Sequence, residues 1–172
     1  MWGVSTDVIA EFESSLQGTA SAVEVVATDE LPGVLREHVA DPAVGAPLPF
    51  EGAGYGNTSV EPLASADDPL DLKTGVTAAG MGVANYGTIT VRSTAAGDEL
   101  VSLYPERHVA VLAASDVVPD MDDAFERLGE EFASGDDTQV LATGPSATAD
   151  MGSLVEGVHG PKDVRVVVLE DR

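Results

Sequence analysis

The segment from residue 142 to residue 161 carries glycines, hydroxyls and a carboxylate in a pattern suited to binding a small anion. Gly144-Pro145-Ser146 stands between a predicted strand and a helix expected over 148–156. Ligands of open α/β sheets bind where parallel strands end, and free N–H groups at a helix start suit a carboxylate or phosphate. We therefore expect a ligand site here. Its candidate residues are Gly144, Ser146, Thr148, Asp150, His159 and Gly160.

Ordinary structural roles account for the same residue types. Ser146 and Thr148 are common helix caps, and an aspartate such as Asp150 in a first turn matches the helix dipole. Gly160 before a proline makes a natural turn, in which His159 would only hydrogen-bond. Spacing alone leaves both interpretations open.

A second glycine-rich block, residues 75–91, could bring polar groups to the same cleft. Its glycines permit close backbone approach, but it has neither the GxGxxG order nor the lysine of a phosphate-binding loop, so nucleotide binding is not indicated. The candidate ligand-binding residues in this block are Asn85, Gly87 and Thr88.

Other chemistries find little support in the residue types. The chain has no cysteine, so it cannot supply thiolates to an iron–sulfur cluster or use a cysteine nucleophile. The isolated histidines His38, His108 and His159 lack metal-ligand spacing, and His108, at the head of an apolar run, is expected to be structural. We expect no metal and no cofactor on this chain, and no residue can be assigned as catalytic.

The charge balance restricts the partners. The sequence has 30 acidic and 8 basic residues, a net charge of -22, and the acids are scattered along the chain. This pattern favours the solvated surface of a protein adapted to high salt, where screening removes most self-repulsion; a nucleic-acid mimic or an acidic partner-binding face are the alternatives. Without a basic patch, binding to nucleic acid or an anionic membrane surface is not expected.

No targeting or membrane segment is evident. No apolar run approaches the roughly 20 residues that span a bilayer, and the first residues lack the basic start of a signal peptide. We expect a cytoplasmic protein.

Strands and helices alternate along the chain. Helices are predicted at 6–18, 29–39, 120–133 and 148–156 from apolar residues at helical spacing, caps and acidic first turns. Strands are predicted at 22–28, 72–79, 88–93, 100–104, 109–113, 139–143 and 164–169. Residues 41–70 allow only a short strand at 47–50 and a loop at 52–57.

This alternation indicates one α/β domain over residues 1–172, with a helical lead-in at 1–20. The 172 residues suffice for one core, and strands alternating with helices predict a Rossmann-like, mostly parallel sheet with helices on both faces.

Three ordered blocks between residues 70 and 170 resemble the LUD family, in particular its lactate-utilisation protein C members. The blocks are Gly75-Val76-Thr77 with Gly87-Thr88-Ile89, Leu100-Val101-Ser102-Leu103-Tyr104-Pro105 with His108-Val109-Ala110-Val111, and Gly144-Pro145-Ser146 with Thr148-Ala149-Asp150 and Gly157-Val158-His159-Gly160-Pro161.

The resemblance implies a fold similar to that of sugar-phosphate isomerases and coenzyme A transferases. It also implies a role beside iron–sulfur proteins that oxidise L-lactate to pyruvate, with this chain as a subunit that binds a small carboxylate or a partner. Such a subunit carries no cofactor, and whether it is itself an enzyme stays open. The alternative is a stand-alone enzyme acting on a phosphorylated sugar or acyl ligand, and a third is a regulatory module without a ligand. Asn85 and Gly152 stand where the family usually has acids, which removes a carboxylate base from position 85.

Overall fold

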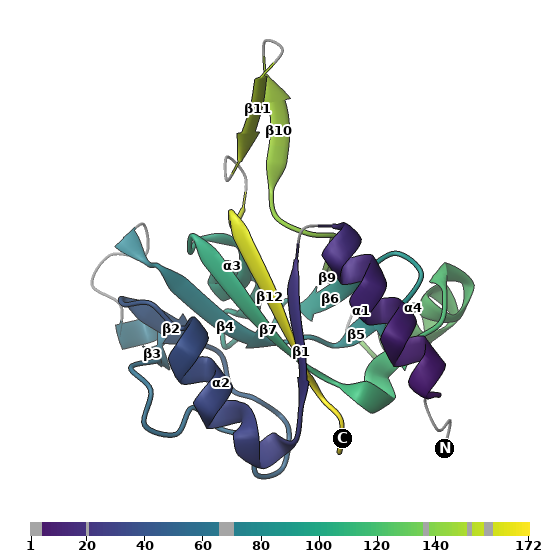
Figure 1. The fold of residues 1–172 in the computed structure, drawn as a ribbon, viewed down its shortest axis with the longest axis horizontal. Helices are drawn as coiled ribbons and strands as arrows, with labels where there is room; N and C mark the ends of the chain where they lie inside the picture. The colour runs from purple at the N-terminus through teal and green to yellow at the C-terminus, as the bar shows by residue number, and fades with distance from the viewer. Residues whose placement is uncertain (1–4, 20, 66–70, 136–137, 151–152, 157–159) are drawn as a thin grey trace.

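Two sheets form the body of the protein, and a narrow hairpin projects from it (Figure 1). The computed structural model describes residues 5–19, 21–65, 71–135, 138–150, 153–156 and 160–172. No helix in these ranges is long and apolar enough to cross a membrane.

The main sheet is parallel throughout, as the alternation of strands and helices predicted. Its six strands lie in the order β1-β12-β7-β4-β2-β3. Their bounds are β1 Ala22–Val26, β2 Ala43–Gly45, β3 Glu61–Pro62, β4 Thr74–Ala78, β7 Arg107–Ala113 and β12 Asp163–Leu169. The central strands β7 and β12 are nearly continuous apolar runs because both of their faces are buried.

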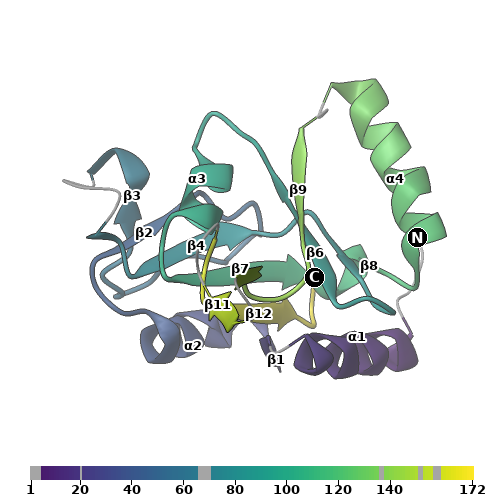
Figure 2. The same ribbon diagram turned by 90° about the horizontal axis from the view of Figure 1, so that it is seen from above.

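Alternate residues of the central strands feed two separate cores. Val109 and Val111 of β7 pack with α2 (Leu31–His38) on one face. On the other face, Ala110 and Leu112 pack against α1 (Thr6–Gly18) and the second sheet. Figure 2 shows α2 on one side of the six strands and α1, α3 and the small sheet on the other. Helices therefore cover both faces, but a small sheet shares one of them.

The second sheet is mixed and has the order β8-β5-β6-β9. Its strands are β5 Met81–Val83, β6 Thr88–Arg92, β8 Val117–Val118 and β9 Gln139–Ala142. Helix α4 (Met121–Ser134) covers its outer face through Ala124 and Leu128, which pack on Met81 and Val83. The helix begins at Asp120, whose carboxylate accepts hydrogen bonds from two first-turn N–H groups, and it ends at Gly135 in the left-handed conformation.

The prediction of a helix over 148–156 is wrong. Residues Ala147–Asp150 (β10) and Ser153–Glu156 (β11) pair instead as an antiparallel hairpin. Residues 147–150 alternate small and polar residues, but 153–156 do not, and segments of four residues are too short to separate a strand from a helical pattern. The backbone N–H of Ser146, expected to be free at a helix start, donates to the Pro161 carbonyl at 2.8 Å.

Two other expectations are corrected. Residues 100–104, expected to be extended, fall mainly within helix α3 (Asp98–Leu103), which begins after Gly97 at φ 84° and has two acids in its first turn. No strand forms at 47–50; the chain pairs earlier, at β2. Turns of 3-10 helix lie at Thr28–Glu30, Leu63–Ser65 and Ala114–Asp116.

Helix α3 approaches the sheet so closely that β4 needs glycine at the contact. A Cβ on Gly75 would lie 1.9 Å from the Val101 carbonyl oxygen and 2.9 Å from Pro105 Cγ. The Val101 contact is with backbone atoms, which leave little scope for relaxation.

We predict that Gly75→Ala lowers the free energy of unfolding by about 3 kcal/mol, since overpacking against backbone displaces α3. Gly129→Ala is the matched control, because a Cβ at Gly129, in exposed helix α4, meets nothing within 4 Å. That control should gain up to about 1 kcal/mol from helix propensity. Urea unfolding compares them; equal stability of the two variants would contradict the close approach.

His108 is a structural residue, as expected. Its side chain is 2% exposed, and its Nε2 lies 2.9 Å from the Thr77 hydroxyl on the neighbouring strand. Burial lowers the pKa of His108 to about 4, so the ring is neutral at pH 7.

This shift predicts a pH dependence of stability. The unfolded chain binds a proton at His108 below about pH 6.5 but the folded chain only below about 4, so stability falls as pH drops between these values, by about 3 kcal/mol in all. We expect His108→Gln, which keeps a polar partner for Thr77, to flatten this part of the profile relative to wild type. Urea unfolding from pH 8 to 4 measures it, and parallel profiles would refute the assignment.

Candidate functional site

A cavity of about 420 Å³ opens at the carboxyl edge of the main sheet. Ala78–Gly80, at the end of β4, form part of its wall, and Asp116 follows β7. Pro47, Pro49 and Phe50, which follow β2, supply an apolar side. Open α/β sheets bind ligands at this edge, and a volume of this size accommodates small organic molecules. We name this cavity the edge pocket.

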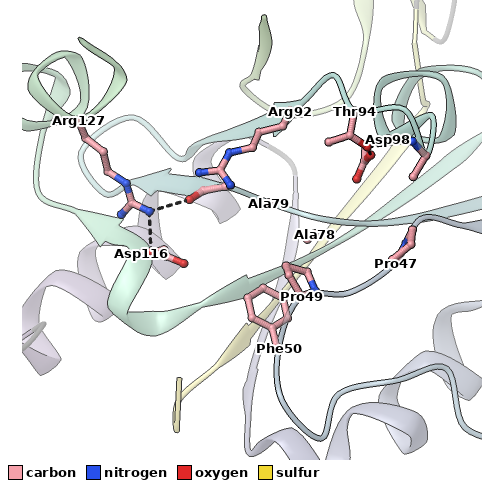
Figure 3. A pocket seen from close by; sticks show the side chains of 12 residues that line it. Pro47, Pro49, Phe50, Ala78, Ala79, Arg92, Thr94, Asp98, Asp116 and Arg127 are labelled. Carbon is pink, nitrogen blue, oxygen red and sulfur yellow. Dashed lines mark hydrogen bonds and ion pairs between the residues drawn. The ribbon is translucent and has the colours of Figure 1, made fainter. Parts of the chain in front are cut away.

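Two arginines line the edge pocket from the small sheet and its helix. Arg92 is the last residue of β6, and Arg127 lies in the middle of α4. Arg127 Nη2 donates to Asp116 Oδ1 at 2.6 Å and to the Gly80 carbonyl at 3.1 Å. In Figure 3 the two guanidinium groups lie on the same side of the pocket, with Asp116 next to Arg127. They are two of only 8 basic residues in the chain.

Glu131, one turn after Arg127 on α4, joins the two arginines. Its Oε1 accepts from Arg92 Nη2 at 2.8 Å and from Arg127 Nε at 3.4 Å, and its Oε2 accepts from Gln139 of β9. The Glu131 side chain is only 13% exposed. Burial alone would raise the pKa of Glu131, but the hydrogen bonds from Gln139 and Arg92 and the positive charges outweigh it and lower that pKa. Glu131 is therefore ionised at neutral pH.

One donor of this group, the Nε of Arg92, is buried and finds no acceptor in the part of the chain that the structure describes. Gly80 contributes to the space around it, since a Cβ there would lie 3.4 Å from Arg92 Nε and 3.1 Å from Thr90 Oγ1. A buried donor without an acceptor costs about 1–3 kcal/mol, and an acceptor from a bound ligand or water would remove that cost.

The other side of the edge pocket presents a carboxylate. Asp98 is 7% exposed and accepts a hydrogen bond from the Thr94 hydroxyl. Both side chains lie across the pocket from Arg127 in Figure 3. The ionisable residues in the lining are two arginines and two aspartates, a set that can bind an anionic group and accept hydrogen bonds from hydroxyls. None of these four was identified from the sequence.

The edge pocket is not lined by any of the predicted ligand-binding residues whose side chains the structure describes, which are Asn85, Gly87, Thr88, Gly144, Ser146 and Gly160. Gly87, Thr88 and Gly144 lie where β6 and β9 meet the end of α1. Gly87 (φ 62°) faces the Ser15 backbone, and Gly144 (φ 77°) faces the Thr19 carbonyl. The Thr88 hydroxyl is 2.6 Å from that of Thr143. These contacts fasten α1 to the small sheet.

The remaining predicted residues lie apart from that junction. Asn85 is exposed, and its N–H donates to the Pro119 carbonyl. Ser146 and Gly160 meet at the base of the hairpin, where a Cβ on Gly160 would lie 3.3 Å from Ser146 Cβ. Thr148 and Asp150 belong to β10, and His159 lies outside the described residues. Among the residues of this second group whose side chains the structure describes, Ser146 and Gly160 are the pair in close contact.

The sequence held weak signals for the edge pocket. Arg127 and Glu131 have the i, i+4 spacing of a helical ion pair, and Arg92 ends an alternating strand. Neither feature distinguishes a pocket residue from a surface one, because the convergence of α4, β6 and the β7 end is a tertiary property.

Comparisons with known proteins place the chain in a family. The family model described as "LUD domain" matches residues 2–169. Lactate utilization protein C of Bacillus licheniformis is 36% identical over 102 residues, 57% of this chain and 42% of that protein. The protein of the same name from Halalkalibacterium halodurans is 33% identical over 122 residues, 69% of this chain and 52% of that protein. That from Deinococcus radiodurans is 27% identical over 171 residues, 95% of this chain and 80% of that protein.

A solved structure supports the fold. The crystal structure of a DUF162 family protein from Deinococcus radiodurans matches with a TM-score of 0.72 at 20% identity, covering 95% of this chain and 97% of that one. The aligned part spans only about half the length of several of the relatives, 42% and 52% in the first two named above. Because the family model extends over nearly the whole sequence, the chain belongs to the LUD domain family.

Proposed function

We propose that this chain is a subunit of a lactate-utilisation system, in which iron–sulfur partner proteins carry the electrons and this chain binds a small carboxylate. Several relatives are named lactate utilization protein C. The absence of cysteine fits a division of labour in which the cluster ligands belong to partners.

The observation that carries the ligand part of this proposal is the arginine pair of the edge pocket. Arg92 and Arg127 face one cavity at the carboxyl edge of a parallel sheet, in a chain of net charge -22. Guanidinium groups bind carboxylates through paired N–H donors. Asp98, on the other side, can accept a hydrogen bond from a hydroxyl such as that of a 2-hydroxy acid.

A second candidate function rests on the size of the edge pocket. Its volume of about 420 Å³ lies within the range of pockets that hold drug-sized ligands, so a molecule as small as lactate would fill only part of it. The alternative is therefore a stand-alone enzyme acting on a phosphorylated sugar or acyl ligand, whose phosphate would use the same arginines. Fold analogy adds little to this alternative.

The residues singled out in the sequence are proposed as the partner contact. Residues 85–88 and 144–161 include the hairpin β10–β11, which stands clear of the body in Figure 1. An isolated two-stranded ribbon is marginally stable in water, so packing against a partner would stabilise it. Ser146 and Gly160 support this proposal by joining the base of the hairpin to the start of β12.

The test is purification of the tagged chain from its native host, followed by assay of lactate-dependent dye reduction. We expect cysteine-rich iron–sulfur proteins to co-purify with that activity. Arg127→Gln should lower the activity at least tenfold while partner recovery stays unchanged, because the substitution removes a ligand contact. Arg36→Gln, an exposed arginine on α2, is the matched control and should be unaffected.

Recovery of the chain alone, inactive with lactate, would refute the subunit proposal. Turnover of a sugar phosphate by the chain alone would establish the alternative. Thermal unfolding of Arg127→Gln separates a lost ligand contact from a displaced α4, since only the latter lowers the melting temperature strongly.

A further inference from the structure

The Glu131 carboxylate makes the interactions with the pocket arginines that an organic anion would make. One of its oxygens accepts from both Arg92 and Arg127, and the other accepts from Gln139. A ligand carboxylate or phosphate presents the same oxygens to the same donors. Glu131 and such a ligand therefore compete for the two guanidinium groups.

The two arginines differ in how fully the described residues satisfy their donors. Arg127 is engaged by Asp116 and the Gly80 carbonyl as well as by Glu131. Arg92 differs, because its Nη2 donates to Glu131 while its buried Nε has no partner among the described residues. An acceptor from a ligand would satisfy Nε, so Arg92 is the more direct contact.

The local charge shows why Glu131 controls binding. The lining contributes two arginines and two aspartates, and Glu131 adds a further negative charge next to them. With Glu131 in place, this set sums to one negative charge and opposes an incoming anion. If Glu131 releases the guanidinium groups, both become available at the side of the pocket opposite Asp98.

We propose that Glu131 is an internal competitor that sets the affinity of the edge pocket for a small organic anion. The carboxylate or phosphate of the ligand takes the Arg92 and Arg127 donors, and Glu131 keeps only Gln139. This inference deepens the proposed function, since it rests on a ligand that carries an anionic group, and carboxylate and phosphate share that chemistry.

The experiment compares two variants that remove the same charge from the same helix. Isothermal titration with L-lactate, and separately with inorganic phosphate, measures Kd for wild type, Glu131→Gln and Glu126→Gln. It is run at the lowest KCl concentration at which wild type stays folded, because salt screens the interaction. Glu126 is exposed and makes none of the arginine contacts.

We expect Glu131→Gln to bind at least one of the two anions about tenfold more tightly than wild type, whereas Glu126→Gln matches wild type. In the Glu131→Gln background, Arg92→Gln should abolish the gain. A gain in affinity for L-lactate identifies the ligand as a carboxylate, and a gain for phosphate alone identifies it as a phosphorylated compound.

Three results would overturn the inference: no gain with either anion in a folded Glu131→Gln protein, an equal gain in Glu126→Gln, or a gain that survives Arg92→Gln. If Glu131→Gln fails to fold, Glu131→Ala provides the same test, because alanine preserves helix propensity. The proposed function fails separately. If Glu131→Gln binds the anion more tightly but no iron–sulfur partners are found, Glu131 is a competitor and the subunit proposal is refuted. If the complex is active but Glu131→Gln shows no gain in affinity, the subunit proposal stands and the competitor inference is refuted.

Discussion

Glu131 is the point at which the helix, the small sheet and the edge pocket are held together. Its carboxylate binds Arg92 at the end of β6, Arg127 on its own helix and Gln139 on β9, and Arg127 extends the network to Asp116 behind β7. In the described residues, the apolar contact between α4 and the small sheet is a small cluster around Met81 and Leu128. The orientation of α4 over the pocket therefore depends strongly on ionic contacts, which tolerate rearrangement better than a close-packed core does.

The ionic contacts that orient α4 also affect what the edge pocket can bind. Partly buried charges are stable only when they are paired, so two arginines beside a cavity need carboxylates nearby. Asp116 and Glu131 meet that need with different consequences. Asp116 binds Arg127, which the Gly80 carbonyl also binds. Glu131 is shared by both arginines, and within the described part of the chain Arg92 Nε is left without an acceptor. The same pairing that stabilises the pocket thus restricts what can bind there.

The sequence predicted the elements whose pattern is long or whose caps are explicit. The apolar run at 164–169 lies in β12, and it was recognisable because a strand buried on both faces is apolar at nearly every position. The capped segment at 120–133 corresponds to α4, because a helix buried on one face has apolar residues at helical spacing. The hairpin at 147–156 and helix α3 were missed, since each segment is short enough to fit either period. Packing on the sheet, at Gly75, decides the conformation of α3.

The candidate site was also predicted only in part. The edge pocket lies at the carboxyl ends of parallel strands, where open α/β sheets bind ligands, but the prediction from sequence applied this rule to the residues after 139–143. That strand, β9, pairs with β6 in the small sheet, and no local pattern reports which sheet a four-residue strand joins. His108 was correctly assigned a structural role, because the apolar residues after it place it inside a buried strand.

The most direct measurement is a crystal structure of the chain bound to one anion at saturating concentration. The anion is L-lactate or phosphate, whichever binds more tightly. The account predicts electron density for the anion within hydrogen-bond distance of Arg92 Nε, with the Glu131 carboxylate turned away from the two guanidinium groups. Density at the base of the hairpin beside Ser146 and Gly160, with Glu131 still bound to both arginines, would contradict it.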